Sequence, residues 1–276
     1  MAHGEIFQVA AAVLVATVVV AAAEEDSGGL EEAEASVVAV QVVHGNGFHE
    51  HISFFLMRIN LQQRLKTLAK RITGRTGFEG SAQYWDNRYR ADGNSGSGSF
   101  NKLALFKADF LNGFVKENKI TSVIEWGCGD GNQLLLAEYP EYTGLDVSKA
   151  AIAKCRKLFG NRSSMKFEVT GKYRAMKRAK LALSLDVIYH LVEDDVYHQY
   201  MQQLFSSAEK FVIIYSCDFD STQYPQHVRP RKFSEDVHRW FPDWQLSGIT
   251  KNAYPLESFG ETNGSWSDFY IYSKNK

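Results

Sequence analysis

The sequence predicts an α/β fold with a doubly wound, mostly parallel sheet. Three observations lead to this prediction. An apolar run at residues 120–124 is followed directly by the glycine-rich stretch 125–131 and then by helix-like residues 132–137. Further apolar strand candidates alternate with segments of helical period along the chain. With 276 residues, 45% of them hydrophobic, the chain can bury a substantial core.

The predicted elements follow one another in alternating order. Residues 103–117 repeat apolar side chains at helical spacing before the first strand. The remaining predicted strands are 142–146, 165–169, 181–186, 211–216, 244–249 and 269–272, and the remaining predicted helices are 149–159, 194–208 and 232–241. Ser148 is the expected N-cap of helix 149–159. Strands separated by helices favour a mostly parallel sheet.

The spacing of the glycines after the first strand excludes two common kinds of nucleotide-binding loop. A dinucleotide fingerprint requires a glycine where this chain has Asn132. The Gly-Lys-Ser/Thr ending of a Walker loop is also absent. Instead, Gly127, Gly129 and Gly131 alternate after Glu125. This pattern, Glu-x-Gly-x-Gly-x-Gly, resembles motif I of the class I S-adenosylmethionine (SAM)-dependent methyltransferases.

Two further segments resemble motifs of the same family in the required order. Residues 142–148 form a short strand that ends in Asp146, whose carboxylate can accept hydrogen bonds from both ribose hydroxyls. Strand 181–186 ends at Asp186 and resembles motif IV. The resemblance implies a Rossmann-like methyltransferase fold with seven strands, the last one antiparallel, and SAM as the cofactor. The expected SAM-binding residues are Glu125, Gly127, Gly129, Gly131, Gln133, Asp146, Val147, Asp186 and Val187.

The activity that the resemblance implies is methyl transfer to oxygen or nitrogen of a small-molecule or glycan-like acceptor by in-line displacement. This chemistry needs no metal, and no metal site is expected. An acceptor that loses a proton needs a base, and His190 lies just after Asp186. The alternative is that His190 caps or packs the start of a helix. His227 is the second candidate base, while Arg229 and Arg231 beside it either bind an anionic acceptor or face solvent.

Missing features exclude several substrate classes. The Asn/Asp-Pro-Pro-Tyr/Phe motif of amino-methylating DNA enzymes, a Pro-Cys nucleophile and a paired-glutamate loop are all absent from the sequence. The net charge of −1 gives no bias toward polyanions, so no nucleic acid partner is expected. Two other functions remain open: a SAM-binding regulatory or interaction protein without turnover, and aminopropyl transfer from decarboxylated SAM.

The segment 79–100 is a candidate lid of the predicted methyltransferase domain. Its first part is rich in aromatic and charged residues, and its second part is rich in glycine and serine. Tyr84, Trp85 or Tyr89 could present a π face to the sulfonium, and Arg88 could meet a carboxylate of the cofactor or the substrate. Ordinary packing of this segment on its own domain is the alternative.

The methyltransferase domain is expected to span residues 79–276, after an N-terminal extension of residues 1–78. Residues 6–23 are apolar, which is consistent with a signal anchor, a non-native start or a packed alanine-rich helix. An acidic linker, 24–34, comes next. Residues 52–75 form a basic amphipathic helix that either contacts a membrane surface peripherally or docks on its own domain.

The three cysteines, Cys128, Cys155 and Cys217, are odd in number and lack the spacing of metal ligands. Reduced thiols in the cytoplasm are therefore expected. For Cys128, in the glycine loop, a small side chain is the simple explanation and a reactive thiol the alternative. A cytoplasmic location also fits an enzyme that uses an intracellular cofactor, with membrane association through the N-terminal extension as the other option.

Overall fold

The computed structural model describes residues 78–160, 162–172 and 178–275, and the fold is given for these ranges. The apolar segment 6–23, the acidic linker after it and the basic amphipathic helix predicted at 52–75 lie outside the described residues. In the ranges that the structure describes, no helix combines the length and the apolar character that crossing a bilayer requires.

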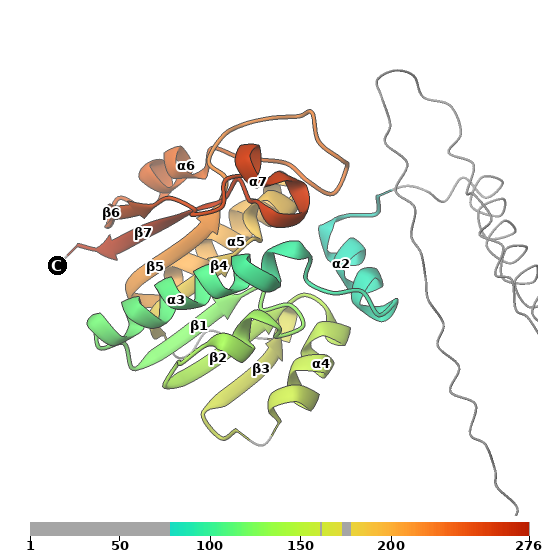
Figure 1. The fold of residues 1–276 in the computed structure, drawn as a ribbon. Helices are drawn as coiled ribbons and strands as arrows, with labels where there is room; N and C mark the ends of the chain where they lie inside the picture. Colours follow the sequence, from blue (N-terminus) through green and yellow to red (C-terminus); the bar gives the residue numbers. More distant parts are fainter. Residues whose placement is uncertain (1–77, 161, 173–177, 276) are drawn as a thin grey trace, which may run out of the picture. The chain divides into compact units, whose positions relative to one another are not determined.

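The described chain forms a seven-stranded sheet with helices on both faces (Figure 1). In chain order, with η for a 3-10 helix, the elements are α2 (Ser81–Arg90), η1 (Ser97–Ser99), α3 (Asn101–Glu117), β1 (Ser122–Trp126), η2 (Gln133–Leu136), β2 (Glu141–Asp146), α4 (Lys149–Phe159), β3 (Met165–Val169), η3 (Thr170–Lys172), β4 (Ala179–Leu185), η4 (Ile188–His190), α5 (Asp194–Ser206), β5 (Ala208–Ser216), α6 (Phe233–Trp240), β6 (Trp244–Thr250), α7 (Leu256–Asn263) and β7 (Asp268–Lys274).

The order of the strands places a crevice at the carboxyl ends of the central parallel strands. The order is β3-β2-β1-β4-β5-β7-β6, and the first five strands of the chain are parallel. Strand β7 runs antiparallel to β5 and β6, which confirms the predicted seven strands with an antiparallel last one. After β1 the chain builds β2 and β3 on one side and then returns to β4 on the other. A crevice therefore opens beyond the carboxyl ends of β1 and β4.

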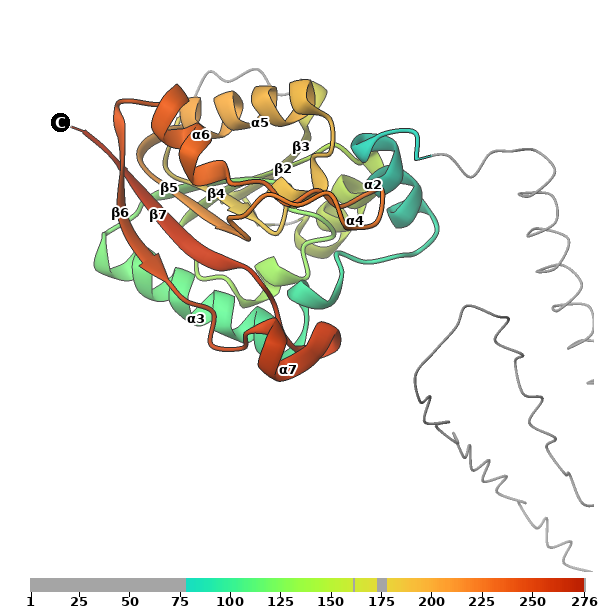
Figure 2. The ribbon, with the colours of Figure 1, turned by 90° about the horizontal axis from the view of Figure 1, so that it is seen from above.

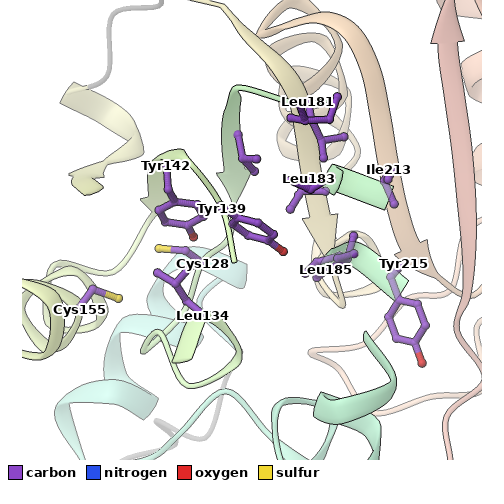
Figure 3. Packing of buried hydrophobic residues seen from close by; sticks show 14 of the residues in the cluster. Cys128, Leu134, Tyr139, Tyr142, Cys155, Leu181, Leu183, Leu185, Ile213 and Tyr215 are labelled. Carbon is purple, nitrogen blue, oxygen red and sulfur yellow. The ribbon is translucent and has the colours of Figure 1, made fainter. Parts of the chain in front are cut away.

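Two apolar layers hold the helices on the sheet. Because successive strand residues point to opposite faces, Val123 and Ile124 of β1 belong to different buried clusters. Helices α3 and α4 pack on the Val123 face, and α5 and α6 pack on the Ile124 face (Figure 2). In Figure 3, Leu181, Leu183 and Leu185 of β4 contribute to the first of these layers. Burial on both faces is typical of central parallel strands.

The observed elements follow the predicted ones with three differences. The helix expected at residues 132–137 is only the 3-10 turn η2, which ends where Ala137 takes an extended conformation with φ −88° and ψ 140°. Helices α2 and α7 were not predicted as helices. The predicted cap is confirmed: Ser148 accepts a hydrogen bond from the Ala151 N–H at 3.2 Å.

Candidate functional site

The glycine loop after β1 needs backbone conformations that other residues rarely adopt. The φ angles of Gly127, Gly129 and Gly131 are 83°, 58° and 80°, all in the left-handed region. A Cβ on Gly127 would collide with Val187, and a Cβ on Gly129 would collide with the Ser95 hydroxyl. The alternating glycines therefore allow the loop to pass close to the end of β4 and to the segment after α2.

A cavity of about 310 Å³ opens against this loop, at the carboxyl ends of β1, β2 and β4, and is called the glycine-loop cavity below. Eight of the nine predicted cofactor residues line it: Glu125, Gly127, Gly129, Gln133, Asp146, Val147, Asp186 and Val187. The ninth, Gly131, packs toward Phe159 and Cys155 instead, so its role is to shape the loop.

Asp146 is a buried carboxylate fixed by backbone donors. Its Oδ2 accepts from the Gly129 N–H at 3.0 Å, and its Oδ1 accepts from the Ser148 N–H at 2.8 Å. Burial raises the pKa of Asp146 to about 6, and the two backbone hydrogen bonds oppose this rise. The carboxylate is thus held at the end of β2 with accepting capacity left over.

Glu125 and Gln133 supply two further polar groups. Burial raises the pKa of Glu125 to about 7, although the hydroxyl of Tyr142 donates to it at 2.6 Å. Gln133 Nε2 donates to the carbonyl of Ala104 at 3.0 Å, which fixes the amide so that Oε1 is the free end. Within the described residues, this buried Oε1 has no hydrogen-bond partner.

Asp186, at the end of β4, is the most connected acid of the site. Its φ of 58° is left-handed, an uncommon conformation that Asp tolerates better than most residues. Oδ2 accepts from Lys107 Nζ at 2.7 Å, and Oδ1 accepts from the hydroxyls of Tyr189 and Ser267 at 3.0 and 3.2 Å. These partners fix the carboxylate toward the crevice between β1 and β4.

His190 and His227 lie beside each other. Their rings are stacked with centroids 6.1 Å apart, and His190 Nδ1 lies 3.1 Å from the carbonyl oxygen of His227. Because a carbonyl only accepts, Nδ1 carries the proton and Nε2 carries the lone pair. Burial lowers the pKa of His190 to about 4 and also lowers that of His227. Both imidazoles are therefore neutral at pH 7.

The segment 79–100 covers the glycine-loop cavity with α2 and the loop after it. Trp85, Tyr89, Ser95 and other residues of the segment line the cavity. Hydrogen bonds join the segment to the rest of the domain: Ser81 N and Oγ donate to Glu193 at 2.8 and 2.5 Å, Ser148 Oγ donates to Asp86 at 2.8 Å, and Ser95 Oγ donates to Asp130 at 2.8 Å. The segment occupies the place expected of a lid; its movement stays a prediction.

A second cavity of about 380 Å³ is also lined by Trp85 and is called the aromatic cavity below. The predicted residues Tyr84, Trp85, Arg88, Asp186, His190 and His227 line it, together with Tyr189, Trp266 and several serines and glycines. Four residues line both cavities: Trp85, Ser95, Asp186 and His190. The two cavities thus adjoin at these side chains.

Arg229 and Arg231 were predicted to bind an anionic acceptor or to face solvent, and the structure places them outside both cavities. Arg229 Nη1 and Arg231 Nη1 lie 2.9 and 2.6 Å from Asp194 Oδ1. The hydrogen bond from Arg231 lowers the pKa of Asp194 below its usual range. Both arginines also donate to the carbonyl of Val192, so they hold the start of α5.

Several lining residues were missed by sequence reasoning, chiefly Lys107, Ser95, Tyr189 and Trp266. A signal existed for Lys107. It lies four residues from both Leu103 and Leu111 in a predicted helix, so it shares their buried face. A charged side chain on such a face needs a partner. Ser95, in contrast, lies in a glycine- and serine-rich stretch whose composition is typical of a linker, so the sequence gives no signal for it.

No protein-family model and no curated protein matches the sequence. Solved structures do match the fold. The N-methyltransferase NodS from Bradyrhizobium japonicum WM9 has 11% identity and a TM-score of 0.51, over 64% of this chain and 99% of NodS. The magnesium protoporphyrin IX methyltransferase ChlM from Synechocystis PCC 6803, with bound SAM, has 13% identity and a TM-score of 0.50, over 72% of this chain and 99% of ChlM. At such identities the similarity concerns the fold, and the chain has the fold of the class I SAM-dependent methyltransferases.

Proposed function

We propose that this chain is a SAM-dependent methyltransferase that methylates oxygen or nitrogen of a small acceptor. The pair of adjoining cavities supports this proposal most directly. One is formed around the glycine loop and Asp146, the other is rich in rings, and both are lined by Asp186 and His190. Cofactor and acceptor in these two cavities would have their reacting groups near the shared residues.

The side chains around the glycine-loop cavity fit SAM. The unpartnered Oε1 of Gln133 is suited to accept from an ammonium such as that of the methionine end. Asp146 retains accepting capacity for ribose hydroxyls, and Gly127 and Gly129 line the cavity beside it. When bound, SAM supplies a methyl group on a positively charged sulfur, which makes the methyl carbon electrophilic.

The role proposed for His190 is to take the proton that an O–H or N–H acceptor loses. Its Nδ1–H is occupied by the carbonyl of His227, so Nε2 is the atom with the free lone pair. The low pKa keeps this lone pair available at neutral pH. His227 lines only the aromatic cavity, whereas His190 lines both cavities. This difference favours His190 as the base.

Ligand-induced thermal stabilisation tests the cofactor, and labelled SAM tests the turnover. We expect SAM and S-adenosylhomocysteine to raise the melting temperature of the protein, and Asp146→Ala to abolish the rise. No rise with either ligand would refute the proposal. Label transferred from methyl-labelled SAM to a compound in an extract of the source cells, and lost in His190→Ala, would exclude a binding protein without turnover.

A further inference from the structure

The aromatic cavity contains one charge that the protein does not neutralise. Its charged lining residues are Arg88 and Asp186, and Asp186 is already paired with Lys107 at 2.7 Å. Among the described residues, no carboxylate lies within 4.0 Å of Arg88. The Arg88 guanidinium donates instead to the Asn94 carbonyl at 2.7 Å.

Arg90 provides the contrast on the same helix. It pairs with Asp86 at 2.8 Å and lines neither cavity. Arg88 also lies against a ring, with its guanidinium carbon 5.5 Å from the centre of Trp85. A guanidinium that is oriented by a neutral carbonyl and a ring, and faces a cavity, keeps donors for a carboxylate or phosphate.

The two histidines add no further positive charge to the aromatic cavity. Burial, and after it the charge of Arg88, lowers the pKa of His227. His190 is neutral as well, since burial lowers its pKa to about 4. Because Asp186 is paired with Lys107 and neither histidine is charged, Arg88 is the one charged lining residue of the aromatic cavity without a counter-charge among the described residues.

The remaining lining is unusually rich in rings. Six of the seventeen lining residues carry one: Tyr84, Trp85, Tyr189, His190, His227 and Trp266. Tyr84 stacks on His227 with centroids 4.4 Å apart, and Tyr189 meets Trp266 edge to face at 6.1 Å. Ring walls of this kind favour a flat ligand ring. A volume of about 380 Å³ suits a small molecule.

We propose that the methyl acceptor is a small ring-bearing anion whose carboxylate or phosphate binds Arg88 and whose nucleophilic oxygen or nitrogen lies beside Asp186 and His190. The inference rests on the proposed function, because it names the substrate class of the same site. An aromatic carboxylic acid and an aromatic phosphate ester share this chemistry, and the phosphorus content of the methylated product distinguishes them.

The first experiment sorts the products by charge. The full-length enzyme is incubated with methyl-labelled SAM and an extract of the source cells, and the labelled products are separated by size and by anion exchange at pH 7. We expect the label in small molecules that the anion exchanger retains. Label in neutral, cationic or macromolecular products would overturn the inference while leaving methyl transfer intact. No label in any fraction would overturn the proposed function itself.

The second experiment uses the retained acceptor with Arg88→Gln, Arg88→Lys and the matched control Arg90→Gln. We expect Arg88→Gln to raise KM for the acceptor by about 10- to 100-fold while kcat changes little, since a charge-assisted contact away from the reacting atoms is lost. Arg88→Lys should restore part of the loss, and Arg90→Gln should behave as wild type. An equal KM in wild type and Arg88→Gln would overturn the inference.

Discussion

Lys107 Nζ lies 2.7 Å from Asp186 Oδ2, and only 1% of the lysine side chain is exposed. This ion pair fastens α3, which precedes the first strand, to the end of β4. Because so little of the lysine is exposed, its charge depends on Asp186 for compensation. The pair therefore couples the stability of the domain to the position of an acid that lines both cavities.

Removing one member of this pair should cost much stability. We expect Lys107→Met to lower the free energy of unfolding by about 3 kcal/mol, because the partly buried carboxylate of Asp186 loses its counter-charge. The double variant Lys107→Met/Asp186→Asn should recover part of this loss. The matched control is Lys180→Met, which breaks the exposed pair with Glu209 and should cost less than about 1 kcal/mol. Urea unfolding measures all three, and equal losses at the two lysines would contradict the prediction.

His190 should matter for turnover and little for cofactor binding. His190→Ala is expected to lower kcat by about 10²- to 10⁴-fold while the Kd of S-adenosylhomocysteine stays the same. His198, on α5 outside both cavities, provides the control variant His198→Ala. Since burial lowers the pKa of His190 to about 4, protonation of this residue should not reduce activity between pH 8 and about 6. Full activity of His190→Ala would assign the proton to another group.

Cofactor affinity should weaken on acidification because of Asp146. Burial raises the pKa of its carboxyl to about 6, so the free protein holds the accepting carboxylate above this pH and loses it below. We expect the Kd of S-adenosylhomocysteine, measured by calorimetry from pH 8 to 5, to rise below about pH 6. In Asp146→Asn the affinity should be weak and should lack this step. A step of the same size in the variant would point to Glu125, whose pKa is about 7.

The contact between Ser81 and Glu193 should control how firmly α2 covers the site. Glu193→Ala removes the acceptor of two hydrogen bonds from Ser81. We expect faster proteolytic cleavage within residues 79–100 and faster release of S-adenosylhomocysteine, with bound ligand slowing the cleavage. Glu209→Ala, at an exposed pair, is the control. Cleavage that neither the variant nor the ligand changes would exclude a lid that opens at this contact.

The sequence predicted the sheet because its strands are buried runs and its helices have regular apolar stripes. Helix α2 escaped prediction for the opposite reason. Its buried residues are only Ser81 and Tyr89, and it is held mainly by hydrogen bonds to side chains far away in the chain, such as Glu193 and Ser148. Helix α7 is interrupted by Gly260, whose φ is 67°, so no helical period is visible there.

The site was predictable only where its residues follow strands in recognisable motifs. Asp146, Asp186 and the alternating glycines are of this kind. Arg229 and Arg231 show the limit, since a basic pair in a loop has no period and its partner Asp194 lies thirty-five or more residues away. Whether a loop arginine faces a cavity or a helix end depends on tertiary contacts. Arg88, in helix α2, shows the other outcome, since it faces the aromatic cavity.

Trp85 and Ser95 line both cavities, and Ser95 also bonds to Asp130 of the glycine loop. The wall of the aromatic cavity is thus made by the same segment that covers the glycine-loop cavity. If segment 79–100 settles over a ligand in the glycine-loop cavity, that ligand is enclosed first. The wall that the segment gives to the aromatic cavity is then in place for the second ligand. This arrangement favours a compulsory order in steady-state kinetics, with the nucleotide-like ligand first on and last off, and product inhibition patterns would reveal it.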